Sequence, residues 1–152
     1  MHLELIAITE SGEPAKTLPS QPEIVAEVVH ATTRMYRASG YERPWIGYLA
    51  IENGECVGTC GFKSPPHNNR VEIAYFTFPG YESRGIATRM ATELTRMATA
   101  TVPAVVVAAQ TLAENNASTS VLKKLGFLMV GTIDHPEDGL VWEWQLSNSS
   151  TA

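Results

Sequence analysis

The fold is decided by residues 71–88, which read VEIAYFTFPGYESRGIAT. Residues 71–78 are typical of a strand, and residues 84–99 carry apolar side chains at helical spacing. A strand that turns through a glycine-bearing loop directly into a helix leaves free N–H groups at the helix start, and these form a nest for an anion. Gly85 and Ala87 add no bulk that would keep a phosphate from the backbone. The stretch therefore predicts a site for a phosphorylated cofactor.

Two common nucleotide sites do not fit this loop. It lacks the Gly-Lys-Ser/Thr of a P-loop and a complete Gly-x-Gly-x-x-Gly, so an ordinary nucleoside triphosphate or dinucleotide site is not supported.

Composition limits the partners further. The chain has 152 residues, enough for one domain, and a formal net charge of −5 without a stripe of Lys and Arg, which argues against a nucleic-acid partner. No segment reaches the roughly 20 apolar residues that cross a bilayer, and the N-terminus lacks the pattern of a signal peptide. We therefore expect a cytoplasmic protein, with Cys56 and Cys60 as small core residues rather than disulfide or metal ligands.

Before the deciding stretch, the sequence predicts strands at 2–8, 45–51 and 56–62. Asn53-Gly54 is the strongest short hairpin signal and joins the last two of these strands. A helix is expected to start at Ser20, with Ser20 as its cap and Glu23 completing a capping box, and to end near Gly40.

After it, Pro103 to Ala109 reads as a strand covered on both sides. A short helix is expected over 116–125, with Asn115 or Asn116 as its cap and Gly126 as its left-handed stop. A closing hairpin should join 127–132 to 140–146. On its second strand the side chains expected to alternate inward are Leu140, Trp142, Trp144 and Leu146.

Two motifs then carry a resemblance to a known family. Glu82-Ser83-Arg84-Gly85-Ile86-Ala87 resembles motif A of the GNAT N-acetyltransferases, Gln/Arg-x-x-Gly-x-Gly/Ala. Residues 115–127, NNASTSVLKKLGF, are similar to the Asn-x-x-Ser-x-x-Val-Leu-x-Lys-Leu-Gly-Phe signature of the RimJ/RimL-type branch, which includes enzymes that acetylate protein N-termini. The two motifs stand in the family's order and separation, and the resemblance covers residues 45–146.

This resemblance implies a single GNAT domain over 1–146, with a flexible tail at 147–152. The implied fold is α+β, a mixed and mostly antiparallel sheet of about seven strands flanked by helices and splayed between strands four and five to admit acetyl-CoA. No metal is required. The acceptor would be an amine, on a small molecule or a peptide N-terminus, and a homodimer is a family possibility. Since neither motif contains Cys, transfer would be direct within a ternary complex.

The cofactor contacts implied by the resemblance lie in the fourth strand, the loop and the last helix: Tyr75, Phe76, Thr77, Ser83, Arg84, Gly85, Ile86, Ala87, Thr88 and Asn115. In relatives, a bulge in the fourth strand turns backbone amides toward the thioester, and residues 75–77 would lie there. Glu82 departs from the family's Gln or Arg. Its carboxylate should therefore point away from the diphosphate or pair with Arg84 or Arg89.

Two residues are candidates for proton transfer. Glu72 stands ten residues before motif A, where histone-type relatives carry their base; the alternative is a strand glutamate that pairs with a neighbour. Leu122 occupies the position of the tyrosine that many relatives use to protonate the leaving thiolate. Ser118, one turn earlier, is the replacement that the branch pattern suggests, although a first-turn serine can also serve backbone N–H groups.

Glu82 and Leu122 keep two further classes of protein open. One is a non-catalytic acyl-CoA sensor with a GNAT fold, and the other is a partner-binding module that has lost the cofactor.

Overall fold

A computed structural model gives the fold and describes residues 2–147. The helices and strands, in chain order, are β1 (Leu3–Ala7), α1 (Ile24–Ser39), β2 (Gly47–Glu52), β3 (Glu55–Phe62), β4 (Arg70–Thr77), α2 (Ile86–Thr101), β5 (Val106–Leu112), α3 (Ala117–Lys124), β6 (Leu128–His135) and β7 (Gly139–Ser147).

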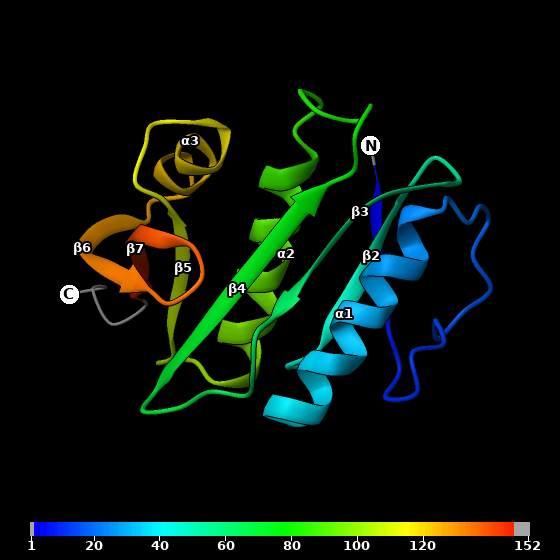
Figure 1. Cartoon of the computed structure of the whole chain (residues 1–152), viewed down its shortest axis with the longest axis horizontal. Helices are drawn as coiled ribbons and strands as arrows, with labels where there is room; N and C mark the ends of the chain where they lie inside the picture. Colours follow the sequence, from blue (N-terminus) through cyan, green and yellow to red (C-terminus); the bar gives the residue numbers. More distant parts are fainter. Residues whose placement is uncertain (1, 148–152) are drawn as a thin grey trace.

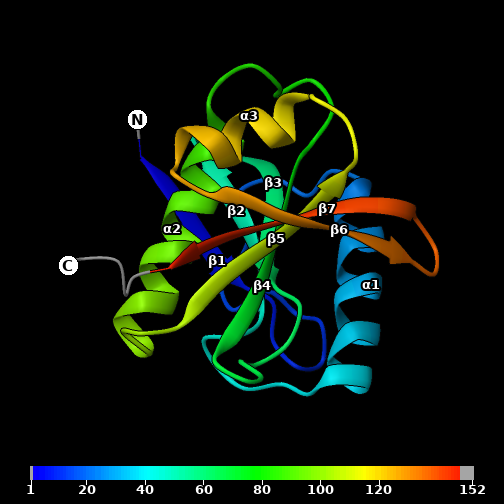
Figure 2. The ribbon, with the colours of Figure 1, turned by 90° about the vertical axis from the view of Figure 1, so that its left-hand side faces the viewer.

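Within residues 2–147 the strands form one seven-stranded sheet in the order β1-β2-β3-β4-β5-β7-β6. Neighbouring strands are antiparallel except β4 and β5, which are parallel and connected through α2. Helices α1 and α2 lie on opposite faces of the sheet (Figure 1, Figure 2). The predicted α+β fold with a mixed, mostly antiparallel sheet is confirmed.

The sheet opens between its two parallel strands. Strands β4 and β5 pair from Arg70↔Val106 to Glu72↔Ala108, and the described residues give no pairing beyond this point. Strand β5 turns instead to β7, with which it pairs along its full length from Val106 to Leu112. The parallel strands therefore diverge after Glu72, as the resemblance implied.

The divergence, rather than a bulge, turns backbone amides toward the opening. Strand β4 pairs with β3 from Ile73 to Thr77, and no register shift is recorded in that part of the described chain, so the bulge expected at 75–77 is wrong. The Lys63 amide donates to the Glu72 carbonyl on the β3 side. Because successive residues of a strand point their amides to opposite edges, the Tyr75 and Thr77 amides face the edge that β5 has left.

The core is continuous across both faces of the sheet. All six residues of β2 are buried, and Met90 and Leu94 of α2 are fully buried beneath β3 and β4. Cys56 and Cys60 are buried free thiols, as expected for small core residues. At the β2–β3 hairpin, Asn53 and Gly54 have φ values of 51° and 75°, the left-handed pair that the Asn-Gly signal predicts.

Three local predictions are wrong: the cap of α1, the start of β5 and the inward orientation of Leu140. Helix α1 begins at Ile24 after Glu23, which has no side-chain cap bond, and the Ser20 hydroxyl instead accepts a hydrogen bond from the Cys56 amide at 3.3 Å. The long connection before α1 thus uses its serine to bind the sheet.

Strand β5 runs from Val106 to Leu112 rather than from Pro103, because the Val106 amide donates to the Asn69 carbonyl and sets the parallel register there. Leu140 is 57% exposed instead of inward. It pairs with β6 only, since the β5 pairing of β7 stops at Val141.

Candidate active site

The loop before α2 presents free backbone donors. Ser83 and Gly85 have φ values of 67° and 75°, and Gly85 is the N-cap residue without a side-chain cap bond. In the described part of the chain, the amides of residues 85–88 have no protein acceptor. A Cβ built on Gly85 would meet nothing within 4 Å, so this position faces open space. These features fit the diphosphate of a coenzyme.

Arg89 holds this loop from the first turn of α2. Its guanidinium donates to the carbonyls of Gly85 at 3.4 Å and Arg84 at 3.3 Å. It also forms an ion pair with Glu52, a buried residue at the end of β2. The loop is thereby tied to the sheet without using the amides of residues 85–88.

A cleft of about 350 Å³ lies in front of these amides, and we call it the cofactor cleft. Its lining comes from the end of β4, the loop, the start of α2, and α3: Tyr75, Phe76, Thr77, Tyr81, Glu82, Ser83, Gly85, Ile86, Ala87, Thr88, Ala117, Ser118 and Val121. Most of the residues that the sequence assigned to the cofactor are brought together here.

Two of them are not in the lining. The Arg84 guanidinium lies 5.2 Å from the centre of the Tyr81 ring, outside the cleft wall. Asn115 also lies outside it, where its side chain accepts a hydrogen bond from Lys123 at 3.4 Å.

Glu82 has neither of the arginine partners expected for it. Its carboxylate accepts a hydrogen bond from the Gly80 amide at 2.8 Å, while Arg84 stacks on Tyr81 and Arg89 pairs with Glu52. Glu82 also contributes to the cleft wall, and the expectation that its carboxylate points away from a diphosphate stays a prediction. Its negative charge therefore stands at the rim of a cleft suited to an anion.

The start of α3 is fixed by Asn116 rather than Asn115. The Asn116 side chain accepts from the Thr119 amide at 3.1 Å, and the Asn116 amide donates to the Thr119 hydroxyl at 2.9 Å, which completes a capping box. Asn115 is therefore not the cap. Thr119, and not Ser118, closes the box, and Ser118 lines the cofactor cleft.

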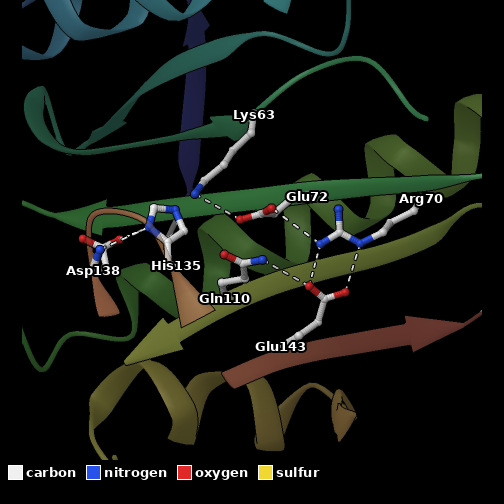
Figure 3. A network of polar contacts seen from close by, with 7 residues as sticks. All are labelled: Lys63, Arg70, Glu72, Gln110, His135, Asp138 and Glu143. Atoms are coloured by element: carbon white, nitrogen blue, oxygen red, sulfur yellow. Dashed lines mark hydrogen bonds and ion pairs between the residues drawn. The ribbon is translucent and has the colours of Figure 1, made fainter. Parts of the chain in front are cut away.

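Glu72 lies where β4 and β5 diverge, in a small cavity of about 90 Å³ that we call the polar cavity. Its side chain is 13% exposed, and its carboxylate forms ion pairs with Lys63 at 3.0 Å and Arg70 at 3.5 Å (Figure 3). Glu72 therefore pairs with neighbours, as expected if it is an ordinary strand glutamate. It also lines a cavity whose wall includes Tyr75 and Ser118.

A network in which Glu143 is buried and Arg70 is partly exposed supports this position from β7. Arg70 donates to both carboxylate oxygens of Glu143, at 3.0 Å and 2.7 Å, and Gln110 donates at 3.2 Å (Figure 3). Burial raises the pKa of Glu143, but hydrogen bonds from Arg70, Gln145 and Gln110 outweigh it, and the pKa lies below its ordinary value. Sequence reasoning missed this network, because no motif marks a lone glutamate within the apolar run of β7.

Tyr75 connects the two cavities. Its hydroxyl donates to the Ser118 carbonyl at 3.2 Å, which links β4 to α3 across the opening of the sheet. Burial raises the pKa of the Tyr75 phenol to about 12. The nearby Leu122 is fully buried in the core and offers no polar group. Tyr75 and Ser118 are thus the hydroxyl-bearing residues common to the cofactor cleft and the polar cavity.

The described residues contain neither a cluster of metal ligands nor a membrane-spanning helix. No group of three or more His, Cys, Asp and Glu side chains there is placed to hold a metal ion. Nor does any helix in residues 2–147 have the length and apolar content needed to span a membrane.

The opened sheet, the free amides and the adjoining polar cavity are together the features expected of a protein that binds a diphosphate-bearing cofactor. Comparison with known proteins agrees, because the acetyltransferase (GNAT) domain matches residues 3–128. The chain belongs to the GNAT family, as an acetyl-CoA-dependent acetyltransferase. No curated protein matches the chain.

Solved structures share the fold at low identity. The ribosomal alpha-N-protein acetyltransferase RimL is 19% identical, with a TM-score of 0.71 over 95% of this chain and 92% of RimL. The putative acetyltransferase yncA from Salmonella typhimurium, solved with acetyl-CoA, is 15% identical, with a TM-score of 0.66 over 100% of this chain and 97% of its own. A chimera of the spermidine N-acetyltransferase SpeG from Vibrio cholerae and hSSAT is 13% identical, with a TM-score of 0.69 over 97% of this chain and 96% of its own.

Proposed function

We propose that this protein transfers the acetyl group of acetyl-CoA to a primary amine by direct attack within a ternary complex. Acetyl-CoA supplies the acetyl thioester. The observation that carries the proposal is the set of unpaired amides at residues 85–88, which faces a cleft that adjoins the polar cavity of Glu72. No Cys contributes to the cofactor cleft or the polar cavity within the described residues, which supports direct transfer.

Each group has a proposed task. The amides of residues 85–88 would bind the diphosphate, and the Tyr75 and Thr77 amides, which face the opening of the sheet, would bind the pantetheine arm and the thioester oxygen. Ser83, Ile86, Ala87 and Thr88 would shape the cleft around the coenzyme. Arg84 could reach a coenzyme phosphate only by leaving the Tyr81 ring, so its role stays a prediction, as does that of Asn115.

Glu72 is the proposed base. An alkyl ammonium has a pKa near 10.4 and must lose a proton before it can attack, so Glu72 would accept that proton directly or through water. The amine nitrogen then forms a bond to the carbonyl carbon, the bond from that carbon to sulfur breaks, and the nitrogen loses its second proton, which would replace the proton that Ser118 gives to sulfur. Ser118 is the proposed donor of a proton to the departing thiolate, and its place in both cavities supports this role.

A second function has its own support. The buried Leu122 favours a non-catalytic acyl-CoA sensor, because it lacks the usual acid. The negative charge of Glu82, a residue of the cleft wall, disfavours a diphosphate and favours a module that has lost the cofactor. The acceptor, a small-molecule amine or a peptide N-terminus, and the cytoplasmic location remain predictions.

The test is an acetyl-CoA consumption assay over a panel of amines that includes peptide N-termini, combined with thermal unfolding with and without acetyl-CoA. If the protein is an acetyltransferase, acetyl-CoA should raise its unfolding temperature, and at least one amine should cause release of free thiol. Stabilisation without release for any amine would favour the sensor. If millimolar acetyl-CoA causes neither stabilisation nor thiol release, the result would favour the partner-binding module.

A further inference from the structure

A third cavity lies on the α1 side of the sheet, and we call it the apolar pocket. It has a volume of about 230 Å³. Its lining comes from α1, β2, the end of β3, and β4: Thr32, Met35, Gly47, Thr59, Cys60, Gly61, Phe62, Lys63, Ala74, Tyr75 and Phe76. Small-molecule sites commonly measure about 300–1,000 Å³, so this pocket suits a small group.

The apolar pocket adjoins the reaction site. It shares Lys63, Ala74 and Tyr75 with the polar cavity that contains Glu72, and it shares Tyr75 and Phe76 with the cofactor cleft. An amine nitrogen placed beside Tyr75, between Glu72 and the end of the cofactor cleft, would therefore extend its carbon body into the apolar pocket.

The charges around this pocket disfavour a second cation. Lys63 is the one charged residue in its lining, and no carboxylate lines it among the described residues. Glu72, in the adjoining polar cavity, already forms ion pairs with Lys63 and Arg70, and Arg70 also pairs with Glu143. These two cations and two anions balance, so they leave no net negative charge to attract a polyamine.

One more carboxylate lies nearby. Asp138 contributes to a neighbouring cavity that also contains Lys63. Its carboxylate lies 3.6 Å from the Nδ1 atom of His135, and that nitrogen accepts hydrogen bonds from the backbone amides of residues 137 and 138 (Figure 3). Because Asp138 does not line the apolar pocket, an ammonium buried there would have no counter-charge. Burying an unpaired charge is costly, whereas burying an apolar group is favourable.

We propose that the acceptor is a primary amine whose neighbouring group is small and apolar and which carries no second positive charge. The inference rests on the proposed acetyl transfer. This chemistry is found in a free aliphatic monoamine and in a peptide whose first residue is apolar. It is absent from spermidine, the substrate named for one structural neighbour.

Steady-state kinetics with matched acceptors test the inference. We expect kcat/KM for 3-methylbutylamine to exceed that for 1,4-diaminobutane and spermidine by at least about tenfold, the size of effect that a few buried methylenes or one unpaired charge produces. A peptide that begins with Leu should likewise exceed one that begins with Lys, and comparing the Leu peptide with the monoamine tells which source is preferred. Equal or faster acetylation of the polyamines would overturn the inference alone. Failure with every amine would refute the proposed transfer itself.

A pair of variants makes the test independent of the choice of amines. Thr32→Asp introduces a carboxylate into the lining of the apolar pocket, and it should shift the ratio of kcat/KM values toward 1,4-diaminobutane by about tenfold. Thr92→Asp makes the same change at an exposed position of α2 and should leave the ratio unchanged. An unchanged ratio in Thr32→Asp protein that retains the wild-type circular dichroism and acetyl-CoA affinity would place the acceptor elsewhere.

Discussion

The cofactor cleft and the apolar pocket meet at Tyr75, yet they are built differently. The cleft is formed mainly by one continuous segment, from Tyr75 to Thr88, which offers backbone amides and little bulk. The apolar pocket is formed by side chains that α1 and three strands bring together from distant parts of the chain. A group shared by every member of a family can be bound by the backbone, whereas a group that differs between members has to be selected by side chains.

If the cleft depends on its backbone, the largest effect should follow from Gly85→Glu. The change forces a side chain into a left-handed conformation, at about 1–2 kcal/mol, and adds bulk and negative charge where a diphosphate would lie. We expect the Kd for acetyl-CoA, measured by calorimetry, to rise by about 10³-fold, or ~4 kcal/mol.

Gly139→Glu is the matched control, because Gly139 has a φ of 74° and equally open surroundings in the β6–β7 hairpin. Its acetyl-CoA affinity should be that of the unmodified protein. Equal affinity in the Gly85 variant would show that the cleft is not the coenzyme site.

Glu72→Gln tests the junction between the two regions. We expect kcat to fall by about 10²-fold near neutral pH, since a general base contributes at least this much, while the Kd for acetyl-CoA stays nearly unchanged. The remaining rate should rise with pH as solution deprotonates the amine. Stopped-time assays of thiol release from pH 6 to 10 measure both effects.

Glu143→Gln distinguishes proton transfer from support, because Glu143 also bonds to Arg70 but does not line the polar cavity. Its kcat should stay within a few-fold of the unmodified protein. A loss as large as that of Glu72→Gln would mean that both variants act through Arg70.

The stability of Glu143→Gln supplies the third prediction. Losing a charged partner of Arg70 should lower the free energy of unfolding by about 1–2 kcal/mol at pH 7, measured by urea denaturation. Because the pKa of Glu143 is lower in the folded protein than its ordinary value of 4.5, this contribution is present above pH 4.5. It should disappear as the pH falls through the folded pKa, so the two proteins should converge in acid.

Glu4→Gln serves as its comparison. Glu4 pairs with Lys16 at 2.7 Å on the surface, where solvent screens the interaction. Little change in unfolding is expected, and a loss equal to that of Glu143→Gln would argue against the buried network.

The smallest effect on stability should come from removing the cap of α3. Helix α3 forms part of the wall of the cofactor cleft. Asn116→Ala removes the side-chain bond to the Thr119 amide and should cost about 1 kcal/mol of unfolding free energy. Asn115→Ala, one residue earlier, should cost almost nothing, since its side chain bonds only to exposed Lys123. Thermal unfolding of the two variants measures the difference. A lower unfolding temperature for Asn115→Ala than for Asn116→Ala would show that Asn115 is the cap.

Prediction from sequence worked where neighbouring residues decide the outcome. Asn53-Gly54 adopts its expected hairpin, and the segment from strand to helix around Gly85 forms the expected open loop. Prediction from sequence failed where a local signal competed with a contact to a residue far away in the chain. Ser20 bonds to the Cys56 amide instead of capping α1, and Leu140 is exposed because its strand has lost one neighbour at that point.

The sequence by itself therefore determined the fold, the family and the position of the open loop before α2, because strand periodicity, glycine conformations and free helix amides depend on contiguous residues. Only the tertiary structure decided the partners of Glu72, the capping role of Asn116 and the lining of the apolar pocket. Lys63 directly follows β3, Arg70 begins β4 and Glu143 lies in β7. The apolar pocket exists only once strands β2, β3 and β4 have been packed against α1.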